Sequence, residues 1–311
     1  MSEMVSATEH DVTWQEAMTE FLAIKQASGV RPATLQGYRN HIERFFRQFR
    51  GTWNDEQRLK RGLIKHLSED VSPYTYNLRL VYLRAFLDWC VSEQYLSVNP
   101  LKQFKSRKTS ERIVDIPDET LQQLLRLPDL KTYCGLRDYA LILLTLDTGI
   151  RPAEAFRLKP ADIDIKTRQV TIREDVSKTG LGRTLYILPE TAKSIQKLLH
   201  IRPANWANAP LFCKEDGQPM DRHCWNKRIK KYAQTLGINL RPYDLRHAFA
   251  IRFLRNGGNV FALQRILGHT DISMTKRYVY LTQNDLRDVH AQSSPVHKLL
   301  PKKTRIRRLD K

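Results

Sequence analysis

The chain of 311 residues carries 52 lysines and arginines against 33 acidic residues, a formal net charge of +19. This charge argues against a typical metabolic enzyme and favours nucleic acid as the partner, because phosphates attract basic side chains whatever the base sequence. An anionic membrane surface is the alternative. However, no apolar run approaches the ~20 residues of a membrane span, and no signal peptide is expected.

The length suffices for two domains, each with its own core. The four cysteines show no metal-ligand spacing, so we expect reduced thiols in an intracellular protein and no zinc site. Residues 1–11 are polar and predicted to be disordered. Apolar residues then recur at helical spacing in four segments, which predicts a small all-α bundle over residues 12–101. The four helices are expected to begin near Thr13, Pro32, Asp55 and Ser72.

Arginines cover the face of the second helix opposite its apolar stripe, and the polar, basic segment KQFKSRKTSER follows at 102–112. A solvated face is one interpretation of these arginines, but the charge of the whole chain favours a surface that faces DNA. We interpret residues 102–114 as an interdomain linker that can lie along a DNA backbone. The candidate DNA-binding residues are Arg31, Arg39, Arg44, Arg47, Lys105, Arg107 and Lys108.

A second domain is predicted over residues 115–297. Its helix at 136–146 is apolar on nearly every side and is expected to be buried. This helix runs into TGIRPAEAFRL, in which Gly149 supplies a turn and Arg151 stands at the start of a new helix. An arginine there can hold an anion, with Glu154 orienting its guanidinium. The alternative is an ordinary helix start with a surface ion pair.

Period-two alternation at 169–173 and 184–188 flanks the segment SKTGLGR and predicts a β-hairpin. Lys178 lies on the tip side of this hairpin. Such a lysine is usually solvated, but it can also reach into a groove and donate a proton, because neighbouring cations favour proton release.

Helical patterns resume at 189–200, 221–236, 243–255 and 260–267. In LGHTDISMTKRY, which follows, Tyr278 comes nine positions after His269 and next to two basic residues. A phenol, with an ordinary pKa near 10, needs positive charge and nearby donors to act as a nucleophile. By itself this segment favours a packed histidine and an interfacial aromatic. An amphipathic helix is expected at 285–292, and residues 298–311 form a basic tail.

Together these segments resemble the tyrosine recombinase (phage-integrase-type) family over nearly the whole chain. TGIRPAEAFRL, the hairpin lysine, YDLRHAFA, LGHTDISMTKRY and DLRDVHAQSSP occur in the family's order, and the ordered set is far more specific than any single motif. The resemblance implies a mainly α fold with a small antiparallel β-sheet, an N-terminal SAM-like core-binding domain and a C-terminal catalytic domain. It implies the catalytic residues Arg151, Lys178, Tyr243, Arg246, His269 and Tyr278, with Glu154 as an orienting residue.

The mechanism implied by the resemblance has Tyr278 attack the scissile phosphodiester, giving a 3′-phosphotyrosyl link and a free 5′-hydroxyl. The two arginines bind the non-bridging oxygens, Lys178 protonates the leaving oxygen, and His269 assists the phosphate contacts. The covalent link retains the bond energy, so we expect neither a metal nor a nucleotide cofactor. The implied partners are double-stranded DNA and further copies of the chain, as a dimer on a site and a tetramer in synapsis. The implied location is the bacterial cytoplasm, associated with the nucleoid.

One position departs from the family, since Tyr243 stands where histidine, or sometimes lysine, is usual. A phenol donates one hydrogen bond and carries no positive charge. We expect either a neutral donor to the phosphate or reduced activity, and a purely packing role is almost equally compatible. His247, one turn along the same helix, is interpreted as structural, because the family often has histidine there.

Site-specific recombination is therefore predicted, for integration and excision of a mobile element or for resolution of replicon dimers. A type IB topoisomerase, which relaxes DNA as a monomer, and a non-catalytic DNA-binding regulator are the alternatives. The SAM-like domain and the helix after the tyrosine, which in recombinases packs on a neighbouring protomer, argue against the first. The presence of Tyr278, Lys178 and both arginines argues against the second.

Overall fold

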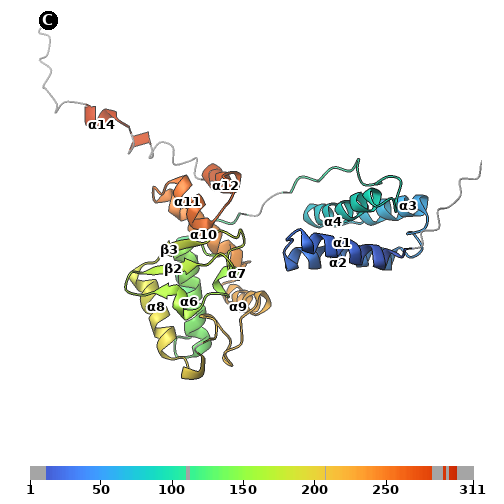
Figure 1. Cartoon of the computed structure of the whole chain (residues 1–311). Coiled ribbons are helices and arrows are strands. Elements are labelled where there is room, and N and C mark those ends of the chain that lie inside the picture. The colour runs from blue at the N-terminus through green and yellow to red at the C-terminus, as the bar shows by residue number, and fades with distance from the viewer. Residues whose placement is uncertain (1–11, 110–112, 207, 282–289, 292–293, 300–311) are drawn as a thin grey trace, which may run out of the picture. The chain divides into compact units, whose positions relative to one another are not determined.

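The computed structural model describes residues 12–109, 113–206, 208–281, 290–291 and 294–299. The chain divides into two compact units, Met1–Glu111 and Arg112–Lys311 (Figure 1). The described residues are mostly helical, with one small antiparallel sheet, which confirms the predicted fold class. The predicted disordered start and most of the predicted helix at 285–292 and of the basic tail lie outside the described residues.

The N-terminal unit contains the four predicted helices, and local chemistry sets where each begins. Thr13 and Glu16 form a capping box, with the Thr13 N–H donating to a Glu16 carboxylate oxygen at 2.8 Å. Asp55 and Ser72 cap the third and fourth helices by accepting backbone N–H groups. The helices are α1 (Trp14–Ala27), α2 (Pro32–Gln48), α3 (Glu56–Leu67) and α4 (Pro73–Ser92).

The residues that follow α4 pack back onto this unit. Asn77 donates to the carbonyl of Arg107 at 2.8 Å and accepts from its N–H at 2.8 Å. The Arg107 guanidinium lies 3.9 Å from the centroid of the Tyr76 ring, and Arg84 donates to the carbonyls of Leu101 and Phe104. The first part of the segment predicted as a linker therefore belongs to the N-terminal unit.

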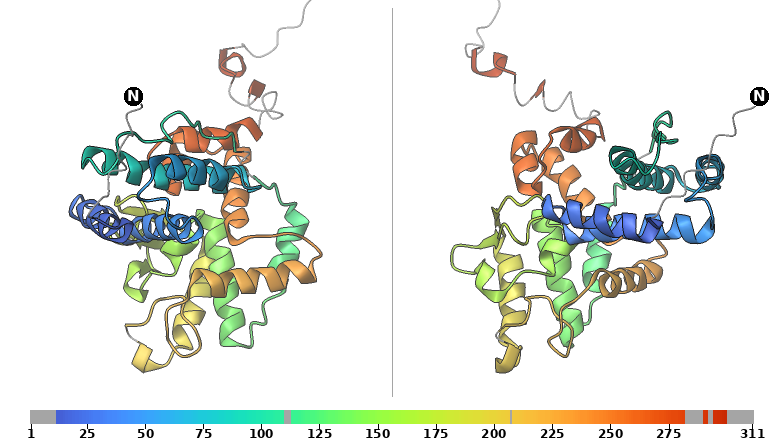
Figure 2. Two further views of the ribbon diagram at one scale, coloured as in Figure 1. Left: turned by 90° about the vertical axis from the view of Figure 1, so that its right-hand side faces the viewer. Right: turned by 45° about the vertical axis from the view of Figure 1, so that its right-hand side comes forward.

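The C-terminal unit has its own hydrophobic core, built around the buried helix that the sequence predicts. This helix, α6 (Tyr133–Thr148), packs against α8 (Pro189–His200) and α10 (Pro242–Arg255) in the interior of the unit (Figure 2). Its buried Asp138 accepts hydrogen bonds from Arg137, Arg228 and Tyr232, which fixes α9 against it. The helices are α5 (Asp118–Arg126), α6 (Tyr133–Thr148), α7 (Pro152–Ala155), α8 (Pro189–His200), α9 (Arg222–Thr235), α10 (Pro242–Arg255), α11 (Val260–Leu267), α12 (Ser273–Leu281) and α14 (Val296–Leu299), with two 3₁₀ turns at Pro160–Asp162 and Ala204–Trp206.

The sheet contains the predicted hairpin and one additional strand. β2 (Gln169–Ile172) and β3 (Arg183–Tyr186) pair antiparallel, with Ile172 opposite Arg183. The short β1 (Ile163–Asp164) adds to the other edge of β2. A strand of two residues is too short to show a period-two pattern, which is why the sequence did not reveal it.

Two glycines turn the chain at the places where the site is built. Gly149 ends α6 with φ +63°, and a Cβ there would lie 2.4 Å from the Phe249 ring. Gly268 ends α11 with φ +62°, and a Cβ there would lie 3.1 Å from the Arg183 guanidinium. These turns place Arg151 and His269 directly after them. No helix in the described part of the chain has the length and apolar character needed to cross a bilayer.

Candidate active site

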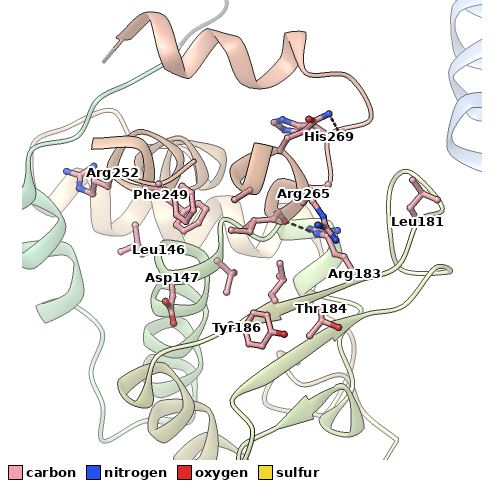
Figure 3. A pocket seen from close by; sticks show the side chains of 18 of the residues that line it. Leu146, Asp147, Leu181, Arg183, Thr184, Tyr186, Phe249, Arg252, Arg265 and His269 are labelled. Atoms are coloured by element: carbon pink, nitrogen blue, oxygen red, sulfur yellow. Dashed lines mark hydrogen bonds between the residues drawn. The ribbon is translucent and has the colours of Figure 1, made fainter. Parts of the chain in front are cut away.

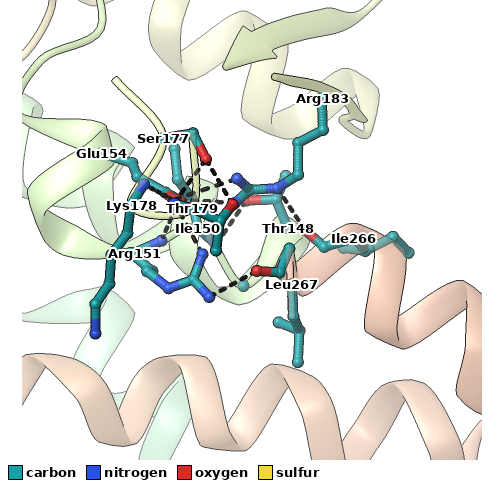
Figure 4. A network of polar contacts seen from close by, with 12 residues as sticks. Thr148, Ile150, Arg151, Glu154, Ser177, Lys178, Thr179, Arg183, Ile266 and Leu267 are labelled. Carbon is teal, nitrogen blue, oxygen red and sulfur yellow. Dashed lines mark hydrogen bonds and ion pairs between the residues drawn. The ribbon is translucent and has the colours of Figure 1, made fainter. Parts of the chain in front are cut away.

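The polar cluster of the C-terminal unit gathers residues from the α6–α7 turn, the hairpin, α10 and the α11–α12 turn (Figure 4). The structure brings Arg151, Glu154, Arg246 and His269 together in one hydrogen-bonded group. Their sequence positions are far apart, so the group depends on the folded unit. The motifs that the sequence singled out thus converge in space.

Arg151 and Glu154 form a buried ion pair. Arg151 Nη1 lies 3.0 Å from Glu154 Oε1, and its Nη2 donates to the Gly268 carbonyl at 3.0 Å. Glu154 is 1% exposed, so the alternative of a surface ion pair is wrong. Burial alone would raise the pKa of Glu154, but the hydrogen bond from Arg183 and the surrounding arginine charges hold it below its ordinary value.

Arg183 is a member of the cluster that no sequence motif indicated. Its Nη2 and Nη1 donate to the two oxygens of Glu154 at 2.7 and 3.2 Å, and its Nε donates to the Ile266 carbonyl at 2.8 Å. One guanidinium thus ties β3 to α7 and to the end of α11. The sequence places Arg183 at the end of the predicted hairpin loop, one residue before the predicted strand, and it gives no sign of the partners of this arginine.

Arg246 is fully buried at the centre of the cluster. Its Nη1 donates to the Gly149 carbonyl at 2.6 Å and its Nη2 to the Leu267 carbonyl at 2.8 Å. Burial and the charge of Arg151 lower its pKa to about 10, so it remains a cation at neutral pH. Its Nε–H has no hydrogen-bond partner among the described residues. A buried donor left unsatisfied is unfavourable, and an incoming anionic oxygen would satisfy it.

His269 lies against Arg246 with a defined tautomer. Its Nε2 is 3.0 Å from Arg246 Nη2, and its Nδ1 is 2.8 Å from Thr275 Oγ1. A guanidinium can only donate, so Nε2 accepts, and we assign the ring proton to Nδ1, which donates to Thr275. Burial and the charges of Arg246 and other nearby arginines lower the pKa of His269 to about 3, so the ring is neutral.

Tyr278, a residue of α12, is buried rather than interfacial, with 1% exposure. It packs against apolar residues of α10 and α11. Its hydroxyl lies 2.8 Å from Nδ1 of His247. The sequence predicts a structural role for His247 and gives no sign of this contact with the tyrosine. Burial, together with the charges of Arg277 and Arg246, lowers the pKa of His247 to about 4.

Tyr243 and Lys178 lie at the edge of the cluster. The Tyr243 ring is 42% exposed, with its centroid 5.1 Å from that of His247 and 5.7 Å from the Arg246 guanidinium carbon. The Lys178 N–H lies 3.5 Å from Glu154 Oε1, while its side chain extends away from that carboxylate (Figure 4). Lys178 is exposed, so its side chain is accessible to an incoming substrate.

A groove of about 1210 Å³ adjoins the cluster between β3 and α11 (Figure 3). His269 and Arg183 line it, together with apolar residues such as Leu181 and Phe253, whereas Arg151, Arg246 and Tyr278 do not. The groove therefore borders the site without containing it. In the described residues no group of three or more histidine, cysteine or acidic side chains is placed to hold a metal ion.

The candidate DNA-binding side chains of the N-terminal unit are all exposed, as contact with DNA requires. Arg47 pairs with Glu43 at 2.8 Å, and Arg107 stacks on Tyr76. Exposed pairs of this kind are weak and can exchange for a phosphate.

The fold and the polar cluster define a class of protein, the tyrosine site-specific recombinases, and comparison with known proteins agrees. Residues 115–285 match the model of the phage integrase family, and the chain belongs to that family. It is 31% identical over 235 residues to the tyrosine recombinase XerD of Ralstonia nicotianae, an alignment that covers 73% of this chain and 75% of that protein. It is 28% identical over 291 residues to XerD of Listeria innocua, covering 88% and 96%.

Solved structures share the fold at lower sequence identity. The Tn1549 transposon integrase in complex with transposon right end DNA aligns with a TM-score of 0.69 and 20% identity, over 86% of this chain and 94% of that chain. A lambda integrase dimer bound to a COC′ core site aligns with a TM-score of 0.66 and 15% identity, over 85% and 97%. These likenesses show a common fold.

Proposed function

We propose that this recombinase cuts and rejoins DNA strands through a covalent link between Tyr278 and a 3′-phosphate. The observation that carries the proposal is Arg246, a buried cation whose Nε–H has no partner among the described residues. Arg151 lies in the same hydrogen-bonded cluster and carries a second positive charge. Two such cations suit the phosphodiester, because negative charge accumulates on its non-bridging oxygens during attack.

Each neighbouring side chain has a role in the proposed reaction. The Tyr278 oxygen forms a bond to phosphorus as the bond from phosphorus to the 5′-oxygen breaks, and Lys178 protonates that leaving oxygen. His269 assists the phosphate contacts by holding Arg246 through its Nε2. Glu154 orients Arg151. The energy of the broken bond is kept in the phosphotyrosyl link, so rejoining needs no cofactor.

We propose double-stranded DNA as the partner, bound in part by the exposed basic residues of the N-terminal unit. The solved lambda integrase is a dimer on a core site, and XerH has been solved bound to palindromic difH substrate. By analogy we propose a dimer on each site and a tetramer in synapsis. We propose two candidate roles, resolution of replicon dimers and movement of a mobile element. The transposon integrase that shares this fold supports the second.

The test is covalent capture on nicked suicide duplexes selected from a randomised library, with adducts resolved on denaturing gels. An adduct that is lost in Tyr278→Phe supports the proposal. A non-catalytic regulator would bind and give no adduct. A topoisomerase would relax supercoiled plasmid that lacks the selected site. Sequencing the captured DNA, and matching it to chromosomal or element-end sequences, separates the two candidate roles.

A further inference from the structure

A hydrogen bond joins His247 on α10 to Tyr278 on α12. His247 Nδ1 lies 2.8 Å from Tyr278 Oη, and the two ring centroids are 5.6 Å apart at an interplanar angle of 49°. Both side chains are buried, at 6% and 1% exposure. The contact therefore lies on the atom that we propose to be the nucleophile, in a setting that excludes water.

The groups around His247 come from both helices. On α10 they are the Tyr243 ring and the Arg246 guanidinium, and on α12 they are Arg277 and Tyr278 itself. The two arginines and burial disfavour a proton on His247, whose pKa falls to about 4. At neutral pH the imidazole is therefore neutral, and the tautomer with its proton on Nε2 offers Nδ1 as an acceptor to the phenol.

Two other side chains of the candidate active site are poorly suited to take the proton of Tyr278. His269 accepts from Arg246 at Nε2 and donates to Thr275 from Nδ1, so both of its ring nitrogens are engaged. Tyr243 is a phenol, which is not a base at neutral pH. Proton removal matters for this nucleophile, because a neutral phenol attacks phosphorus weakly.

We propose that His247 is a further catalytic residue, which takes the proton from the Tyr278 hydroxyl as its oxygen attacks the scissile phosphodiester. This inference rests on the proposed function. The O–H bond breaks and the proton passes to Nδ1, the oxygen–phosphorus bond forms, and the 5′-oxygen leaves with a proton from Lys178. In rejoining, the 5′-hydroxyl gives its proton to the now neutral Lys178 as its oxygen attacks phosphorus. The bond between phosphorus and the Tyr278 oxygen breaks, and His247 returns the proton to the departing phenol.

Substrate binding would make His247 a better base. The phosphodiester carries a negative charge, and it would sit against Arg246, one of the two cations that disfavour protonation of His247. Offsetting that charge raises the pKa of the imidazole, and proton transfer becomes more favourable as the pKa of the base approaches that of the phenol. The base is thus weak in the free protein and strengthened when DNA is bound.

The test measures single-turnover cleavage of the selected suicide duplex by the full chain, with a bridging 5′-phosphorothiolate at the scissile position. The sulfur leaving group needs no proton, so the measurement isolates activation of the nucleophile from the role of Lys178. His247→Asn keeps a polar group near the position of Nδ1 but cannot take up a proton. We expect it to cleave about 10²–10³-fold more slowly at equal DNA occupancy, within the range found for general-base catalysis.

A second variant and a control separate chemistry from packing. His247→Gly leaves space for added imidazole, which we expect to restore cleavage in proportion to the concentration of its neutral form. His200→Asn changes an exposed histidine at the end of α8 and should cleave like the unmodified chain, with no response to imidazole. The cleavage rate of the unmodified chain should fall at acidic pH, whereas His247→Asn should lose this dependence.

Two outcomes would overturn the inference. One is His247→Asn cleaving within about twofold of the unmodified chain with the same pH profile, against the expectation from general-base catalysis. The other is a folded, DNA-bound His247→Gly that imidazole does not accelerate. Either outcome leaves the proposed function standing if Tyr278→Phe forms no adduct. An adduct that persists in Tyr278→Phe would instead show that the proposed nucleophile is wrong.

Discussion

Arg183 and Glu154 form a two-point ion pair, with Nη2–Oε2 and Nη1–Oε1 distances of 2.7 and 3.2 Å. Glu154 also pairs with Arg151, so one buried carboxylate is shared between two guanidiniums. Arg151, Arg183 and Glu154 together keep a net positive charge, because two guanidiniums surround one carboxylate. This sharing fixes Arg151 in position and leaves the cluster attractive to phosphate.

Removal of Arg183 tests this arrangement. Arg183→Ala leaves Glu154 with a single guanidinium partner in a buried setting, and loss of one partner from a buried pair typically costs about 3–5 kcal/mol. Because Arg151 remains, we expect the free energy of unfolding to fall by roughly 2–3 kcal/mol. Urea unfolding measures this change. Cleavage should slow more than DNA binding weakens.

Arg183→Lys is the matched control for that change. It keeps the charge but cannot make the paired hydrogen bonds to both carboxylate oxygens, so it should recover stability better than cleavage. If Arg183→Ala has the unfolding midpoint and cleavage rate of the unmodified chain, the ion pair has no positioning role.

The identity of the nucleophile is tested by Tyr278→Phe. The change keeps the ring that packs against α10 and α11, so the fold and DNA binding should be retained. The free energy of unfolding should fall by about 1–3 kcal/mol, because the buried Nδ1 of His247 loses its hydrogen-bond partner. The covalent adduct should disappear. Tyr280→Phe serves as the control, because Tyr280 is the nearest other tyrosine in the sequence. Loss of the adduct in the control and its survival in Tyr278→Phe would reverse the assignment.

Acid should destabilise the C-terminal unit through two histidines. Burial lowers the pKa of His247 to about 4 and of His269 to about 3, against an ordinary value of 6.5. The unfolded chain therefore binds more protons than the folded one between these limits, and stability is lost as pH falls from about 6.5 towards the folded values. Unfolding midpoints measured from pH 7 to pH 4 should decline.

Substitution of one of these histidines should reduce the slope of stability against pH. His247→Asn removes one titrating group, so its midpoint should vary less over the same range, and His200→Asn provides the exposed control. An identical slope in His247→Asn and in the unmodified chain would mean that His247 is not held neutral in the folded state.

Much of the fold was predictable because local signals are strong in this chain. The observed bounds of α8 and α11 coincide with the predicted ones, since Pro189 starts one helix and Gly268 ends the other. The resemblance of the motifs to those of the recombinase family also grouped Arg151, Glu154, Arg246 and His269 in one predicted site. Gly149 and Gly268, which mark the turns beside Arg151 and His269, can be recognised directly in the sequence.

The missed features depend on long-range contacts. Arg183 meets Glu154 only because β3 passes α7, and His247 meets Tyr278 only because α10 packs on α12. Thr275, which accepts from His269, likewise gave no signal in the sequence. The docking of residues 101–107 on α4 uses backbone groups, which side-chain patterns do not reveal.

The role of the Tyr243 hydroxyl can be tested separately from that of its ring. If it donates to a non-bridging phosphate oxygen, Tyr243→Phe removes a hydrogen bond to a charged group, worth about 1.5–3 kcal/mol, and slows cleavage by roughly 10- to 100-fold. The side chain is 42% exposed, so folding should be unaffected. Tyr243→His should be tolerated or faster. Cleavage by Tyr243→Phe at the unmodified rate and equal DNA occupancy would leave the phenol with a packing role only.

The two units should fold independently and contribute differently to DNA binding. Each has its own hydrophobic core. Ile113, which packs against the apolar cluster that includes Tyr278, lies after the boundary at Glu111. A fragment that starts at Arg112 should therefore fold alone, with a cooperative thermal transition.

Without the basic N-terminal unit, this fragment should lose most of its affinity for the selected site. The logarithm of its affinity should also fall less steeply with the logarithm of salt concentration, because fewer phosphates are neutralised. Fluorescence anisotropy over a salt series measures both quantities, and Arg44→Glu in the full chain should change them in the same direction by a smaller amount. A folded fragment that binds the site as tightly as the full chain would show that recognition resides in the C-terminal unit.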